Sequence, residues 1–169
     1  MNKPTANRLQ HHPRTGGFTL VELSVTMVIA AILAAVAIPA YSNYVRKAHR
    51  TEAKSVLLDL ASLEERYYTA NNNYTETASQ LGYTGTGTTT AQASFSVGSG
   101  YYTVALSKVD ATPPTVAIPG GTPATYSITA TAVGDQLKDT SCRTLTVTSA
   151  GGQTAADAAS AVNTATCWR

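Results

Sequence analysis

The sequence predicts an α+β protein, in which a long amino-terminal α-helix packs on a small antiparallel β-sheet. Two observations predict this fold. A predominantly apolar run extends from Phe18 to Tyr41 and carries one charge, at Glu22. Beyond residue 93, short runs with alternating apolar and polar residues are separated by Gly and Pro, which is typical of antiparallel strands.

The composition argues against a general affinity for polyanions. Only 13% of the residues are charged, and the formal net charge is +2. Lys3, Arg8 and Arg14 precede Phe18, and no acid does; loss of residues 1–17 would leave 9 basic and 10 acidic side chains. We therefore do not expect a nucleic acid to bind across the whole surface.

The apolar run of residues 18–41 is long enough to span a membrane as a helix. Three interpretations compete. A secretory signal peptide would be cut after the run, for instance near Ala35–Ala37, but its apolar core is normally ~7–15 residues long. A plain membrane anchor gives no reason for Glu22, because a carboxylate in lipid is costly and usually functional. The third interpretation keeps the helix after a cut in front of it.

The residues around this cut carry a recognisable motif. Residues 16–23 read GGFTLVEL and are followed by the apolar run. This motif resembles the class III signal of type IV prepilins and pseudopilins. The resemblance implies cleavage between Gly17 and Phe18 and N-methylation of Phe18 by a prepilin peptidase/N-methyltransferase. It also places Glu22 at the family's assembly acid and Pro39 at its helix-bending proline.

The resemblance implies a domain organisation and a location. Residues 1–17 are the cleaved leader, residues 18–41 the transmembrane and filament-core helix, and residues 42–169 the periplasmic or extracellular globular domain of a type IV pilin fold. The precursor is then a single-pass protein of the inner membrane and the product part of an extracellular pilus. The implied partners are other pilin subunits, the processing enzyme and the inner-membrane assembly platform, with no cofactor and no metal.

Glu22 has two candidate partners in this scheme. Cleavage creates an α-amine on Phe18, which stands four residues before Glu22 in the same helix. In a filament, Glu22 of an incoming subunit can instead pair with the Phe18 amine of a neighbour. We hypothesise that Glu22 sets the register of assembly, because a buried pair that loses one partner is destabilised by ~3–5 kcal/mol.

Beyond Tyr41 the helix is predicted to become amphipathic over residues 45–70 and to cover a sheet. Its apolar positions are Ala48, Ala53, Val56, Leu57, Leu60, Leu63 and Tyr67. Its charged residues, which we expect mainly on other faces, are Arg50, Lys54, Asp59 and Glu65. Pro39 is expected to kink the helix or open it near residues 35–39. The Asn residues at 71–73 predict its end.

The remainder predicts a connecting surface segment over residues 71–93 and then three or four strands. The alternating runs are centred on Phe95 and Val97, on Tyr102 to Leu106, on Tyr126 to Ala130, and on Leu145 and Val147. Prolines at 113, 114, 119 and 123 forbid central strand pairing there.

Cys142 and Cys167 predict a disulfide in an oxidising compartment, with two buried free thiols as the alternative. Closing the loop 142–167 stabilises the fold by roughly 3 kcal/mol in the chain-entropy model. The layout resembles the disulfide-bounded carboxyl-terminal region of type IV pilins. The aromatic and threonine pattern of residues 66–68 and 101–104, with the terminal Cys167-Trp168, resembles PilE-type pilins.

The sequence gives little support for a catalytic or ligand-binding motif, and we expect that the protein is not an enzyme. His49 is predicted to be solvated. Asp135 and Asp139 could serve a calcium ion, but two isolated carboxylates are more often solvated. Lys138, Arg143 and Arg169 lie in or beside the cysteine-bounded loop, and three charges supply little affinity for DNA phosphates.

The function implied by the resemblance is that of a structural subunit of a type IV pilus, a minor pilin in preference to the major one. It would serve twitching motility, adhesion and, as a further role, DNA uptake. The alternatives are the major pilin of the same fibre, a pseudopilin of a type II secretion system, and a membrane-anchored adhesin that does not polymerise.

Overall fold

The computed structural model describes residues 17–83, 94–110 and 123–169. The leader up to Gly16 and the prolines at 113, 114 and 119 therefore lie outside the described residues. The chain divides into two compact units with the boundary between Tyr41 and Ser42. Each unit is described by itself. Helix α1 (Leu20–Asn71) begins in the first unit and ends in the second.

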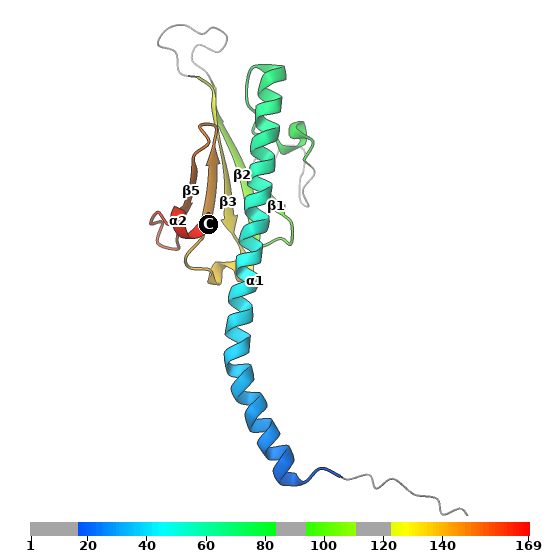
Figure 1. Cartoon of the computed structure of the whole chain (residues 1–169). Coiled ribbons are helices and arrows are strands. Elements are labelled where there is room, and N and C mark those ends of the chain that lie inside the picture. Colours follow the sequence, from blue (N-terminus) through cyan, green and yellow to red (C-terminus); the bar gives the residue numbers. More distant parts are fainter. Residues whose placement is uncertain (1–16, 84–93, 111–122) are drawn as a thin grey trace, which may run out of the picture. The chain divides into compact units, whose positions relative to one another are not determined.

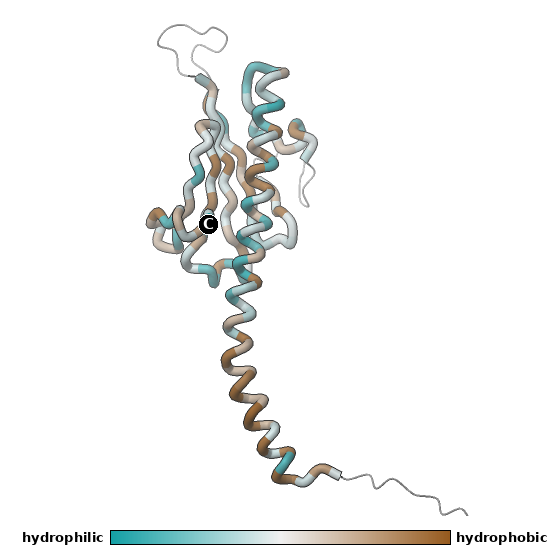
Figure 2. The backbone as a smooth tube through the Cα atoms, viewed as in Figure 1, coloured by the Kyte–Doolittle hydropathy of each residue, from teal (hydrophilic) through white to brown (hydrophobic). Residues whose placement is uncertain are grey.

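The amino-terminal unit is an apolar helical segment with its side chains exposed. An 18-residue window of α1 reaches a mean hydropathy of 2.4 with none of it buried, and Figure 2 shows this stretch mostly in the hydrophobic colour. In the part of the chain that the structure describes, α1 is the one helix that is long enough and apolar enough to cross a membrane. The helix is uninterrupted through Pro39, so the local opening near residues 35–39 is not present.

The carboxyl-terminal unit contains an antiparallel sheet of five strands in the order β1-β2-β3-β4-β5 (Figure 1). The strands are β1 (Ser94–Val97), β2 (Tyr102–Val109), β3 (Thr125–Ala132), β4 (Thr144–Thr148) and β5 (Gln153–Ala156). Each strand pairs with the next along the chain, so every connection is local. The predicted α+β fold is confirmed.

The register of the sheet gathers its apolar residues on one face. Val104 lies opposite Ala130, and Ile128 lies opposite both Leu106 and Val147. All of these side chains are buried. On the other face, the hydroxyls of Thr129 and Thr146 are hydrogen-bonded across neighbouring strands at 3.0 Å. The alternation of apolar and polar residues therefore decides which face covers the core.

The second half of α1 packs on the apolar face of the sheet. Ala53, Leu57 and Leu60 are almost completely buried and belong to the same core cluster as the strand residues. Their spacing of four and three residues keeps them on one face of the helix. The helix ends at Asn71, and Asn72 follows in the left-handed region with φ of 53°, as the run of asparagines predicts. Ala48, predicted on this face, is exposed.

Two further parts of the sequence prediction are wrong. The described sheet has five strands, not three or four, and the strand missed is β5. The segment 71–93 is not merely a surface connection: within it, Tyr74 and Thr75 are buried, and the 3₁₀-helix η1 (Ala78–Leu81) buries Ala78 and Leu81. Residues 74–83, which follow the end of α1, thus contribute to the core.

Two short elements complete the unit. The 3₁₀-helix η2 (Gly134–Lys138) follows β3, and helix α2 (Thr164–Cys167) lies next to β5 near the end of the chain. They bring Asp139 and Cys167 to the same region as Cys142.

Candidate functional site

The start of α1 is fixed by the residues of the predicted processing motif. The Thr19 hydroxyl oxygen accepts a hydrogen bond from the Glu22 backbone N–H at 3.2 Å, and the Leu23 N–H donates to the Thr19 carbonyl at 3.1 Å. Thr19 therefore caps the helix, and Glu22 takes the third helical position, where a carboxylate is favoured by the helix dipole.

The hydroxyl side chains that follow form hydrogen bonds to backbone carbonyls of the same helix, but the Glu22 carboxylate does not. The hydroxyl of Ser24 donates to the Val21 carbonyl at 2.8 Å, and that of Thr26 donates to the Leu23 carbonyl at 2.9 Å. The Glu22 carboxylate has no hydrogen bond or ion pair among the described residues. Gly17 and Phe18 precede the helix and are exposed, Phe18 by 85%. Pro39 lies inside α1 and is exposed.

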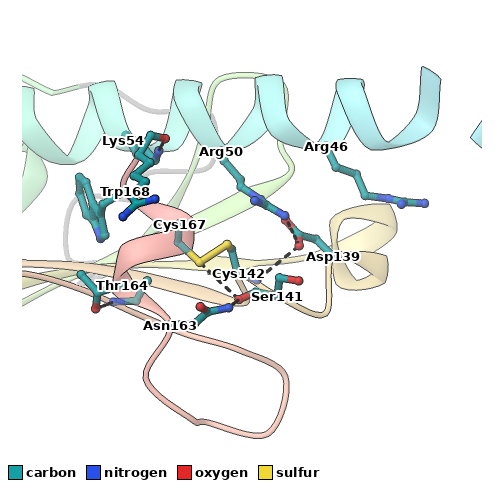
Figure 3. The surroundings of a disulfide bond; sticks show 12 residues. Arg46, Arg50, Lys54, Asp139, Ser141, Cys142, Asn163, Thr164, Cys167 and Trp168 are labelled. Carbon is teal, nitrogen blue, oxygen red and sulfur yellow. Dashed lines mark hydrogen bonds and ion pairs between the residues drawn. A yellow bond between two sulfur atoms is a disulfide. The ribbon is translucent and has the colours of Figure 1, made fainter. Parts of the chain in front are cut away.

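In the carboxyl-terminal unit, a disulfide joins Cys142 and Cys167, with their Cα atoms 5.7 Å apart (Figure 3). Both residues are buried. The Asn163 amide donates to the Ser141 carbonyl at 3.1 Å, and the Trp168 indole N–H donates to the Thr154 carbonyl at 2.8 Å. The end of the chain is thus held to the sheet by a covalent bond and by hydrogen bonds from the residues beside it.

An ion pair next to the disulfide connects α1 to the segment after η2. The Arg50 guanidinium donates through Nε and Nη2 to the two carboxylate oxygens of Asp139, and Figure 3 shows this side chain reaching from the helix. The side chains are 18% and 2% exposed. Asp139 also accepts hydrogen bonds from the Gln136 amide at 3.1 Å and the Cys142 backbone N–H at 3.3 Å. Asp139 is therefore a structural anion held by four donor groups from three residues.

This arrangement corrects two predictions. Asp139 is buried against Arg50 instead of solvated, and no group of three His, Cys, Asp or Glu side chains in the described part of the chain could hold a metal ion. Asp135 is exposed and pairs with Lys138 at 2.8 Å. His49 is half-buried instead of solvated, because its ring lies against that of Tyr101 with centroids 3.8 Å apart.

A second buried carboxylate, Glu64, was missed by the sequence analysis. Its Oε2 accepts the Thr75 backbone N–H at 3.1 Å, while its Oε1 has no hydrogen-bond partner among the described residues. Burial raises the pKa of Glu64 from 4.5 to about 7, an effect that the Thr75 N–H opposes. A signal was available: Glu64 follows Leu57 and Leu60 at the helical spacing of the apolar face.

Comparisons with known proteins match both units. The model of the family described as "Type IV minor pilin ComP, DNA uptake sequence receptor" matches residues 39–146. The model of the "Prokaryotic N-terminal methylation motif" matches residues 13–38. Because the first match extends over more than half of the chain, the chain belongs to this family of type IV pilins. The resemblance that the processing motif predicted is confirmed.

Three curated relatives are similar to parts of the chain. The type IV major pilin protein PilA of Myxococcus xanthus is 33% identical over 72 residues, which are 43% of this chain and 33% of that protein. The type IV wide pilus major component PilA4 of Thermus thermophilus is 39% identical over 81 residues, 48% of this chain and 62% of the relative. The type IV major pilin protein PilE1 of Neisseria gonorrhoeae is 38% identical over 66 residues, which are 39% of this chain and 40% of that protein. The chain spans from a third to about three fifths of the length of these relatives.

The family, the methylation motif and the apolar helix together fit a precursor that is anchored in the inner membrane and becomes part of an extracellular pilus. The pilin family is structural.

The ion pair generates a first prediction. Arg50→Gln leaves Asp139 buried without its cation, and we expect the free energy of unfolding to fall by about 3 kcal/mol. Urea unfolding of the full chain in detergent, followed by the fluorescence of Trp168, measures this. The matched control is Arg66→Gln, at an exposed residue of the same helix, which should change stability by less than about 0.5 kcal/mol. Equal effects of the two substitutions would contradict the assignment.

Glu64 generates a second prediction. Because its pKa is raised in the folded state, the protonated form favours folding. The contribution of Glu64 to stability is complete below pH 4.5 and is lost as the pH rises through about 7. We expect the free energy of unfolding to fall between these values by up to about 1.4 kcal/mol per pH unit.

The control for this pH dependence is a pair of substitutions on α1. Glu64→Gln should flatten the profile between pH 4.5 and 7, whereas Asp59→Asn, at an exposed position, should preserve its slope. A wild-type profile that rises across this range is the contrary result.

Proposed function

We propose that the mature chain is a structural subunit of a type IV pilus, without catalytic activity. Cleavage falls between Gly17 and Phe18, Phe18 is methylated, and residues 18–41 anchor the subunit in the membrane and then pack in the core of the fibre. The exposed apolar segment supports this proposal, because a surface with this hydropathy is stable only in lipid or against other helices. The match to the methylation motif supports the processing step.

The observation that carries the proposal is the unpartnered carboxylate of Glu22. The hydroxyls around it are satisfied within the helix, so Glu22 is the group that the anchored subunit leaves unpaired in the described apolar segment. The α-amine that cleavage creates on Phe18 of a neighbouring subunit supplies the complementary charge. Insertion next to that amine satisfies both groups at once, so the pair favours the assembled state and fixes the register between subunits.

Within the fibre, we assign the chain the role of a minor pilin that serves twitching motility and adhesion. The description of the matching family as a minor pilin supports this assignment. The relatives named as major pilins support the alternative role of major subunit. Quantitative mass spectrometry of purified fibres separates the two: a minor pilin is a small fraction of the pilin protein, and a major pilin is most of it.

The pairing of Glu22 predicts an assembly defect with intact processing. Glu22→Gln removes the charge with little change in size, and we expect incorporation into fibres to fall at least tenfold while the mature chain accumulates in the membrane. Immunoblots of the sheared fibre and membrane fractions measure the ratio. Ser24→Ala, in the same helical turn, removes a self-satisfied hydroxyl and should leave the ratio unchanged. Incorporation of Glu22→Gln at the wild-type level would refute the pairing.

DNA uptake is the second candidate function, supported by the description of the matching family as a DNA uptake sequence receptor. Of the cations near the disulfide, Lys138 is engaged by Asp135, and Arg143 donates to the Leu137 carbonyl at 3.0 Å. Arg169 is exposed. With three phosphate contacts, the affinity would fall about fortyfold between 50 and 200 mM salt.

Binding of labelled duplex DNA by the full chain in detergent tests this candidate. We expect measurable binding at 50 mM salt that is weakened several-fold by Lys138→Ala with Arg143→Ala and not by Arg66→Ala. The absence of binding at 50 mM salt would remove the candidate and leave the fibre role untouched.

A further inference from the structure

A hollow with a cationic lining lies at the start of the carboxyl-terminal unit. It has a volume of about 230 Å³ and is formed by α1 residues on one side and by the last residue of η2 with the three residues after it on the other. Its charged residues are Arg46, Lys47, Arg50, Lys138 and Asp139. We call it the basic hollow.

Internal pairing neutralises only part of this charge. Asp139 is occupied by Arg50, and Lys138 is shared with the exposed Asp135. Arg46 donates to the neutral Asn43 side chain at 2.9 Å and, in Figure 3, extends away from the Arg50–Asp139 pair. The Lys47 side chain has no hydrogen bond or ion pair among the residues that the structure describes. Lys47 is therefore left without a counter-charge among the described residues, and Arg46 is compensated only by the nearby charge of the exposed Asp135, which also pairs with Lys138.

The pKa of a neighbouring lysine reflects the positive charge around the hollow. The pKa of Lys54, one turn after Arg50 on α1, is lowered by burial and then by the positive charges of Arg50 and Lys47. The smaller, electrostatic part of this effect shows that the positive charges of Arg50 and Lys47 are felt one turn further along α1.

The position of the hollow along the chain limits the source of that anion. Arg46 follows Tyr41, the end of the apolar segment, by five residues. At ~3.4 Å per residue, the chain between them spans at most ~17 Å in any conformation, and ~7.5 Å as a helix. The headgroup layer is about 5–8 Å thick on each side of the hydrocarbon core. Tyr41 and Tyr44 are 70% and 73% exposed, as aromatic side chains of the membrane interface are expected to be.

We propose that the basic hollow binds the phosphate of an anionic phospholipid headgroup while the subunit stands in the membrane. The inference rests on the proposed function, since residues 18–41 must lie in the bilayer. An Arg46 guanidinium can match two phosphate oxygens, and Lys47 adds a point charge. Thr140 and Ser141 also line the hollow, and their hydroxyls are of a type that can donate to a phosphate. Its volume equals that of about eight water molecules, which is ample for one phosphate group.

The site gives the resident subunit a polar contact that assembly must break. Extraction of residues 18–41 from the bilayer also withdraws Arg46 and Lys47 from the headgroup layer. The content of anionic lipid therefore sets part of the free-energy difference between the membrane-resident and the assembled subunit.

Native mass spectrometry of the mature full chain, released from micelles with equimolar phosphatidylglycerol and phosphatidylcholine, tests the proposal. We expect preferential retention of phosphatidylglycerol. Lys47→Gln and Arg46→Gln should each lower this preference about fivefold. Arg66→Gln removes one positive charge from an exposed position of α1 outside the hollow and should leave the preference unchanged. Trp168 fluorescence verifies that each variant is folded.

Each result that would contradict the lipid site has its own consequence. Equal retention of the two lipids, or an equal loss with Arg66→Gln, overturns the site. Displacement of the lipid by millimolar inorganic phosphate, with a phosphate adduct in its place, reassigns the hollow to free phosphate. Displacement by a short DNA duplex that binds less tightly to Lys47→Gln reassigns it to nucleic acid. A folded chain that does not enter the micelles contradicts the membrane anchor itself, and with it the proposed function.

Discussion

One carboxylate in an apolar helix is the constraint on which the account of this pilin depends. The hydroxyls of Ser24 and Thr26 form hydrogen bonds within the helix, and the Thr19 hydroxyl accepts a hydrogen bond from the backbone N–H of Glu22. The Glu22 carboxylate is left without a partner in the described chain. A charge in lipid is stable only when it is paired or solvated. In the proposed function another subunit brings a cation to Glu22, which would tie the chemistry of processing to the thermodynamics of assembly.

In the carboxyl-terminal unit, a sheet with few large apolar residues is held against one helix by several kinds of contact. Ala53, Leu57 and Leu60 supply the helical part of the core. At one end of the interface, Arg50 and Asp139 join the helix to the segment before Cys142, and the disulfide then joins that segment to the end of the chain. At the other end, Glu64 receives the N–H of Thr75. Covalent and charged contacts thus frame the small hydrophobic core.

The sequence predicted the features that depend on local pattern and missed those that depend on long-range pairing. The helix, its end at the asparagines and four strands follow from periodicity and cap chemistry. Strand β5 escaped because Gln153–Ala156 carries only small and polar residues, and its place is set by pairing with β4. Asp139 looked solvated because its partner Arg50 is 89 residues away. Glu64 and His49 occupy the apolar face of α1, so their spacing held a signal that residue type obscured.

Retention of the apolar helix in the mature fibre is the central claim, and the mass of the subunit in sheared, purified fibres tests it most directly. The account predicts that the subunit begins at an N-methylated Phe18, with Glu22 and Pro39 both present. A subunit that begins beyond Pro39 would contradict it, because the helix with its single carboxylate would then have been discarded before assembly.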